Sequence, residues 1–154
     1  AGANYILLQT FFDLSMMEVA TKIAVEYGTP VYCMMTFEKR RRTIMGNTVK
    51  QIIDTLTPLG IQGIGMNCSL GPEESLEVIE EYHKLTDLPL MFKPNSGKPI
   101  LDENGNTTQP YTPQQFADDI APALSYVDYI GGCCGCDASY IRALRDKLDA
   151  LGLR

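Results

Sequence analysis

The sequence predicts an α/β fold in which consecutive βα units build a parallel sheet. Short apolar runs alternate with stretches of helical periodicity five times along the 154 residues. The runs are apolar on both faces, which is typical of parallel strands that are covered on both sides. Two architectures fit, an open doubly wound sheet and a part of a (β/α)8 barrel. A complete barrel takes about 250 residues, so five units would be a little over half of one.

The first unit begins with the apolar run at residues 5–11. In the helix that follows, Ser15 and Glu18 have the spacing of a capping box, and Gly28 is expected to end the helix. Apolar residues three and four positions apart predict the buried face. They are Met16, Val19, Ala20, Ile23 and Tyr27.

The other four units repeat this pattern, with strands expected at residues 30–37, 61–68, 88–95 and 127–132. Pro72 suits the first turn of the third helix, and Thr112 with Gln115 predicts a capping box for the fourth. The helix residues expected to be buried are Val49, Ile52, Ile53 and Leu56, then Leu76, Ile79, Tyr82 and Leu85, then Phe116, Ile120 and Leu124, then Ile141, Leu144, Leu148 and Leu151. Six methionines on periodic apolar positions are expected in the core: Met16, Met17, Met34, Met35, Met66 and Met91.

Composition and charge exclude several classes of protein. The chain is 45% hydrophobic and 21% charged, as expected for one domain with a core, and its net charge of −6 disfavours nucleic acid as a partner. No run approaches the roughly 18 apolar residues of a membrane span, and residues 1–13 lack the charged start of a signal peptide. We therefore expect a cytoplasmic protein. The chain does not begin with Met and enters a strand almost at once, so we expect a piece of a longer protein.

The polar and sulfur-containing residues collect at the carboxyl ends of the predicted strands, where parallel βα folds place their sites. Cys68 ends the third strand, and Cys133 with Cys134 ends the fifth. Alternate barrel strands contribute side chains to the same interior layer, so these thiols are expected at one height. Adjacent cysteines can face one ion only if the backbone bends, and Gly131, Gly132 and Gly135 offer that freedom.

Three thiolates with an open fourth position predict a catalytic zinc, because structural zinc sites normally have four protein ligands. Such a zinc would convert a substrate thiol into a nucleophilic thiolate. Two alternatives stay open: a binding or scaffold domain with a structural four-cysteine zinc that adds Cys136, and a dithiol redox protein that uses Cys133 and Cys134. Cys33, in the middle of a strand, is expected in the core, and His83, beside acidic residues, on the surface.

The motifs "GMNCSLGP", "KPNSG" and "YIGGCCG", in this order and spacing, resemble the zinc-dependent homocysteine S-methyltransferase domain family. This is the barrel of cobalamin-dependent methionine synthase and betaine-homocysteine methyltransferase. The resemblance implies that residues 1–154 are the C-terminal portion of such a barrel, its units four to eight, without the N-terminal units. It also implies Zn²⁺ on Cys68, Cys133 and Cys134.

For substrate binding, the resemblance implies roles for Gln9, Asn67 and Asn95. Gln9 stands where the family usually has a Glu that holds the amino group of homocysteine, so here the position brings a hydrogen-bond acceptor without a charge. The implied activity is transfer of a methyl group to homocysteine or a similar small thiol, towards methionine, with a corrinoid or folate donor on another domain or protein. The expected partners are the N-terminal half-barrel or a second copy. The basic run at residues 39–42 is expected to be a solvated loop, with contact to an anionic donor as the alternative.

Overall fold

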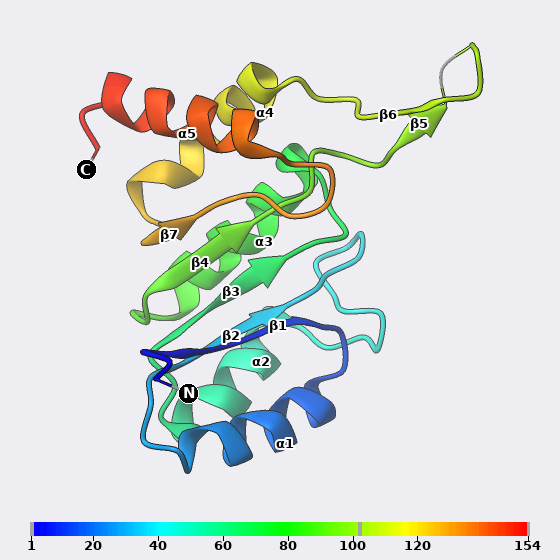
Figure 1. Ribbon diagram of the computed structural model, residues 1–154. Helices are drawn as coiled ribbons and strands as arrows, with labels where there is room; N and C mark the ends of the chain where they lie inside the picture. Colours follow the sequence, from blue (N-terminus) through cyan, green and yellow to red (C-terminus); the bar gives the residue numbers. More distant parts are fainter. Residues whose placement is uncertain (1, 102, 154) are drawn as a thin grey trace.

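The computed structural model describes residues 2–101 and 103–153, and it contains one five-stranded parallel sheet with helices packed along it (Figure 1). The strand order β1-β2-β3-β4-β7 follows the order of the chain. A doubly wound sheet would reverse its order at a switch point, so the unbroken order identifies a part of a (β/α)8 barrel, and the predicted fold class is confirmed. The strands are β1 Ile6–Phe11, β2 Val31–Met35, β3 Gly63–Asn67, β4 Leu90–Lys93 and β7 Tyr129–Ile130.

Each strand of the sheet except the last is followed by a helix that leads back to the start of the next strand. The α-helices are α1 Leu14–Val25, α2 Val49–Leu56, α3 Pro72–Leu85, α4 Pro113–Asp119 and α5 Ala138–Ala150, and the 3-10 helices are η1 Thr57–Leu59 and η2 Ala121–Ser125. The loop between β4 and α4 contains a small hairpin that the sequence analysis did not predict, β5 Ile100–Leu101 with β6 Thr107–Thr108.

The two faces of the sheet differ, because successive side chains of a strand point to opposite sides. Cys33, Ile64 and Phe92 point to the helices and belong to one continuous core to which all five α-helices contribute. The opposite face would line the interior of a complete barrel, and we call it the inner face. Near the strand starts it carries edge-to-face contacts of Tyr32 with Tyr5 and Tyr129.

The predicted buried face of α1 is wrong. Met16, Val19, Ile23 and Tyr27 are 53–75% exposed, whereas the helix buries Leu14, Met17, Thr21 and Ala24. This helix is apolar on most of its circumference, so periodicity offers two stripes, and contact with the sheet selects the other one. Its N-cap is Asp13, which accepts hydrogen bonds from the backbone of Ser15 and Met16, and not the expected Ser15–Glu18 box.

The remaining helices follow the sequence more closely. All four expected residues of α2 are buried, and the capping box of Thr112 with Gln115 is present at α4. Leu85, Ile141 and Leu151, which were expected in the core, are 44–49% exposed. Of the six methionines, Met16 is exposed and the other five are buried. In the part of the chain that the structure describes, no helix has the length and apolar character needed to cross a membrane.

Candidate metal centre

Three cysteine sulfur atoms meet at the carboxyl end of the sheet. The Sγ atoms of Cys68, Cys133 and Cys134 all lie within 4.8 Å of one another, and those of Cys68 and Cys134 are 3.5 Å apart. Cys68 and Cys133 are partly buried, and Cys134 is exposed. The three thiols chosen from the sequence therefore form one cluster whose open side is at Cys134.

A backbone turn brings Cys68 into this cluster. The residue follows β3 directly and has a left-handed backbone, with φ of 67°, as does Ser69 with φ of 63°. Non-glycine residues rarely adopt this conformation, and where they do so they often mark a functional site. The Cys68 amide still donates to the carbonyl oxygen of Lys93 at 3.1 Å, so the turn is anchored to β4.

The adjacent cysteines face the same point because the chain leaves the sheet between them. The Cys133 amide continues the strand pairing by donating to the Pro94 carbonyl oxygen at 2.9 Å, whereas the Cys134 amide donates to Asn95 Oδ1 at 3.0 Å. Gly135 then turns the chain with φ of 81°. Of the three glycines expected to supply the bend, Gly135 is the one with left-handed backbone.

Asn67, the last residue of β3, links the thiol cluster to β1. Its side chain is fully buried, accepts a hydrogen bond from the Thr10 amide at 2.9 Å, and donates to Thr10 Oγ1 at 2.7 Å. The same amide nitrogen lies 3.6 Å from Cys133 Sγ and donates to it. Thr10, which the sequence analysis did not single out, has φ of 64°, and its conformation is held by this pair of bonds. Asn67 therefore orients the Cys133 sulfur in addition to ending its strand.

Asn95 acts as a support for the cysteine loop. It is 8% exposed, and its side-chain oxygen accepts a hydrogen bond from the Cys134 amide, so it fixes the backbone of Cys134. Its neighbour Ser96 is fully buried, and the Ser96 amide donates to the Cys134 carbonyl oxygen at 3.1 Å. The predicted substrate-binding residue is thus engaged in building the site.

Gln9 lies on the inner face at the end of β1, and its side-chain oxygen accepts a hydrogen bond of 3.0 Å from Lys93 Nζ of β4. Lys93 is the register partner of Asn67 on the neighbouring strand. The sequence analysis did not select Lys93, although it directly precedes "PNSG", because a single lysine at the end of a strand is usually exposed to solvent. The two residues are 84 positions apart in the chain.

The other two cysteines lie outside the cluster. Cys136 packs under Gly132, whose Cβ, if present, would lie 2.5 Å from Cys136 Cβ. Burial raises the pKa of the Cys136 thiol to about 11, and its sulfur donates weakly to the Pro94 carbonyl oxygen at 4.0 Å. Cys33 is fully buried, with a pKa raised to about 11 by burial, and it contacts Thr21 Oγ1 at 3.3 Å. The expected core position of Cys33 is confirmed.

Two of the four cations in the basic run at residues 39–42 form ion pairs with α3. Lys39 forms an ion pair with Glu74 at 3.2 Å, and Arg41 contacts Glu81 at 3.4 Å. These contacts support the expectation of a solvated loop. His83 is exposed on α3 as expected, and its ring stacks on Tyr126 at a centroid distance of 4.4 Å.

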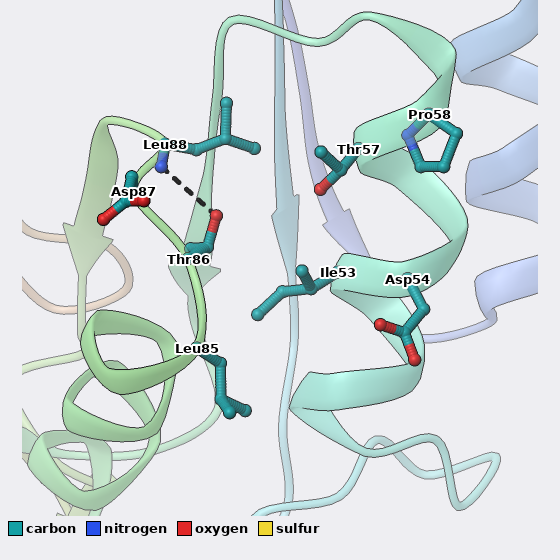
Figure 2. A pocket seen from close by; sticks show the side chains of 8 residues that line it. All are labelled: Ile53, Asp54, Thr57, Pro58, Leu85, Thr86, Asp87 and Leu88. Atoms are coloured by element: carbon teal, nitrogen blue, oxygen red, sulfur yellow. Dashed lines mark hydrogen bonds between the residues drawn. The ribbon is translucent and has the colours of Figure 1, made fainter.

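A cavity of about 640 Å³ lies at the opposite end of the sheet, between α2 with η1 and the end of α3. Figure 2 shows Ile53 and Asp54 on one side, and Leu85 and the loop with Thr86 on the other, where Thr86 Oγ1 accepts from the Leu88 amide at 3.2 Å. Its lining contains no cysteine and comes from the segments that precede β3 and β4. This cavity is therefore separate from the thiol cluster.

The cluster fits a zinc ion of three thiolate ligands. Zinc–sulfur bonds are about 2.3 Å, so tetrahedral ligand sulfurs lie about 3.8 Å apart, close to the separation of Cys68 and Cys134. The three thiols converge on one point, whereas the buried Cys33 and the partly buried Cys136 lie outside the cluster, and the Asn67 amide donates an N–H group to Cys133 Sγ. Thiolate sulfurs suit zinc, and metal ligands in proteins are commonly oriented by hydrogen bonds from neighbouring groups.

Comparison with known proteins gives consistent matches along the chain. A model of the homocysteine S-methyltransferase family matches residues 1–148. Methionine synthases of Mycobacterium leprae and Mycobacterium tuberculosis are each 29% identical over 149 residues, an alignment that covers 92% of this chain and 12% of each relative. The chain therefore spans only about an eighth of these relatives.

Among solved structures, the homocysteine methyltransferase MmuM from Escherichia coli has the same fold. Its apo form superposes with a TM-score of 0.75 over 95% of this chain and 50% of that chain, and its metallated form with 0.76 over 95% and 46%. Both are 22% identical in sequence.

Proposed function

The chain belongs to the homocysteine S-methyltransferase family, and we propose on this basis that it carries the zinc-binding part of a methyltransferase site that acts on a small thiol, with homocysteine as the expected acceptor. The observation that carries the proposal is the convergence of Cys68, Cys133 and Cys134 at the carboxyl end of a parallel sheet. Structural zinc sites are normally closed by four protein ligands, so a cluster of three leaves room for a substrate atom. The known metallated form of MmuM also supports a metal here.

In the proposed reaction, zinc bound to the three cysteines would lower the pKa of a thiol in the open position, so that its sulfur is a nucleophile near neutral pH. The substrate thiol releases its proton, and the sulfur forms a bond to the methyl carbon of the donor. The bond between that carbon and the donor breaks, and its electron pair stays with the donor. A methylated corrinoid or folate on another domain or protein is the donor class that we propose.

The residues of the chain hold the ligands ready for this step. Asn67 donates to Cys133 Sγ, and a hydrogen bond to sulfur stabilises the thiolate form that a metal requires. Asn95 fixes the backbone of Cys134, and the left-handed turn directs Cys68 toward both. Substrate can approach from the side of Cys134, because this is the exposed member of the cluster.

Metal uptake tests the proposal directly. The reduced chain is expected to bind one zinc, and Cys68→Ser, Cys133→Ser and Cys134→Ser are each expected to weaken binding at least about tenfold, because each removes one of three ligands. Cys136→Ser is the matched control and should keep the parental affinity. Equal zinc binding by Cys133→Ser and the parent would refute the proposal.

A sulfur count by X-ray absorption separates this proposal from a structural four-cysteine site. An open site of three cysteines gains a fourth sulfur when homocysteine is added, whereas a closed site does not change. The position of Cys136 under Gly132, with its sulfur directed at the Pro94 carbonyl, favours the open site.

We further propose that residues 1–154 form the C-terminal portion of the barrel and that N-terminal units complete it. The outer stripe of α1 leaves Met16 60%, Ile23 53% and Tyr27 75% exposed, beside the edge strand β1. Contiguous exposed apolar residues and open strand edges mark surfaces that need a partner. The solved relatives are about twice as long as the aligned part, which supports N-terminal units over a second copy. The chain alone should associate in light scattering, and a stable monomer would contradict this proposal.

A further inference from the structure

Lys93 places a positive charge on the inner face directly beside the thiol cluster. Its neighbour Phe92 is fully buried against the helices, so the alternation of the strand points Lys93 to the inner face. Its register partner Asn67 contacts Cys133 Sγ at 3.6 Å. Neighbouring strands lie about 4.8 Å apart, so the lysine side chain starts one strand away from a ligand contact.

The ammonium group of Lys93 has a neutral partner. Its Nζ donates to Gln9 Oε1 at 3.0 Å, and among the residues that the structure describes no carboxylate oxygen lies within 4.0 Å of it. Five other lysines each have such a carboxylate: Lys22, Lys39, Lys50, Lys84 and Lys147. The charge of Lys93 is therefore not balanced by a counter-ion of the described chain.

The hydrogen bond also decides what Gln9 can offer a ligand. A lysine ammonium has donors and no acceptor, so the atom of Gln9 that faces it must be the oxygen. With this oxygen engaged, Gln9 presents its NH₂ group, which is a donor. The pair is thus a surface of donors, and it suits an anion; a substrate ammonium would need an acceptor and would meet a like charge.

We propose, on the premise of the thiol-methyltransferase function above, that Lys93 and the Gln9 amide bind an anionic group of the substrate. The substrate class is then a thiol that carries a carboxylate or a similar acid, and its amino group contributes little to binding. For homocysteine, the carboxylate is the recognised group. Lys93 is a specificity-determining residue in this account.

Three thiols that differ in one group test the inference on the reduced, zinc-loaded chain. They are homocysteine, 4-mercaptobutyrate, which lacks the amino group, and 3-aminopropane-1-thiol, which lacks the carboxylate. Dissociation constants measured by calorimetry are expected to agree within about threefold for the first two and to be at least about tenfold weaker for the third, because charge-assisted hydrogen bonds are the strong ones.

Variants of Lys93 and Gln9 test whether these two residues cause the preference for a carboxylate. Lys93→Met keeps the length of the side chain without its charge. It should weaken the binding of 4-mercaptobutyrate about tenfold, and it should not weaken the binding of 3-aminopropane-1-thiol. Gln9→Glu gives Lys93 a counter-ion and should shift preference toward the aminothiol. Lys50→Met, on the outer surface of α2 and paired with Asp54, is the matched control and should change neither. Zinc content and thermal melts show that each variant is loaded and folded.

The inference is wrong if homocysteine binds at least tenfold more tightly than 4-mercaptobutyrate, or if Lys93→Met binds 4-mercaptobutyrate as well as the parent. Failure of the function itself gives a different result, because the chain would then take up no zinc. In that event the S-methyl thioethers of the three compounds, titrated onto the metal-free chain by NMR, still decide the role of Lys93. A preference for the carboxylate that Lys93→Met removes supports it, and its absence refutes it.

Discussion

Replacing Asn67 by Asp tests how the chain prepares a sulfur for metal binding. The substitution preserves the size of the side chain and the oxygen that accepts from the Thr10 amide at 2.9 Å. It exchanges the nitrogen that donates to Cys133 Sγ at 3.6 Å for an anionic oxygen. Thr10 Oγ1 can turn and donate to this oxygen. The change therefore removes one donor to a sulfur and leaves the rest of the hydrogen bonding in place.

The expected loss can be bounded from the distance. Two unit negative charges 3.6 Å apart repel by about 4.6 kcal/mol at an effective dielectric constant of about 20. A bound zinc ion attracts the new carboxylate and offsets part of this repulsion. Loss of outer-shell partners typically weakens metal binding 10–100-fold, or about 1.4–2.7 kcal/mol, and we expect Asn67→Asp to fall in this range.

The assay is a competitive zinc titration against a chelator at fixed pH, with thermal melts of the metal-free proteins. Asn67→Asp should stay folded because both hydrogen bonds to Thr10 can be kept, whereas Asn67→Ala should lower the free energy of unfolding by about 1–3 kcal/mol because both are lost. Asn95→Asp is the matched control. Its side-chain oxygen serves a backbone amide and no sulfur, so zinc affinity should change less than about threefold. Parental affinity in Asn67→Asp, or equal weakening in Asn95→Asp, would refute the role of the amide donor.

Three further predictions concern the fold. Met17→Ala should lower the free energy of unfolding by about 2–4 kcal/mol and Met16→Ala by less than about 1 kcal/mol in denaturant titrations, because the first side chain is fully buried and the second is 60% exposed; equal losses would contradict the described face of α1. Gly65→Ala should prevent stable folding, measured by circular dichroism, since its Cβ would lie 1.8 Å from the Met91 carbonyl oxygen; a parental melting temperature would contradict this register. Burial raises the pKa of Cys33 from 9.0 to about 11, so between these pH values the thiol ionises in the unfolded state but stays protonated in the folded state. The free energy of unfolding should therefore fall by up to about 2–3 kcal/mol as pH rises from 9 to 11. Cys33→Val should show a smaller fall, and a pH profile identical to that of the parent would show that Cys33 does not cause the fall.

Local signals were sufficient for much of the fold. The capping box of Thr112 with Gln115 depends on residues three apart, and α2 has a single apolar stripe, so both could be predicted from short windows. In α1 the same reasoning failed, because a helix with two apolar stripes needs the position of the sheet to decide between them. Beside the open edge at β1, the stripe that includes Met16 and Tyr27 stays exposed in the described part of the chain.

The candidate site also has a part that the sequence predicts and a part that it does not. That Cys68, Cys133 and Cys134 would meet followed from their places at the ends of alternate strands, which the topology brings to one edge. The contacts that tune the site could not be predicted, because they join distant residues through backbone conformations with no local signature. Asn67 reaches Thr10 across 57 positions, and both Thr10 and Cys68 have a left-handed backbone without being glycine.

The places in the fold from which the supporting contacts come indicate that zinc binding and methyl transfer need different parts of a barrel. The three sulfurs follow the ends of β3 and β7, and the groups that fix them, Thr10, Asn67 and Asn95, lie in the strands of the same sheet or in the loop directly after one of them. A site whose ligands and supports all come from one sheet and the segments that directly follow its strands should bind zinc without further units. Binding of a methyl donor over the inner face, in contrast, needs walls that the open edges do not supply. We therefore expect the chain to bind zinc on its own and to gain methyl transfer only when the rest of a barrel is added; zinc binding that itself depends on those added units would show that the cluster is not organised by this sheet.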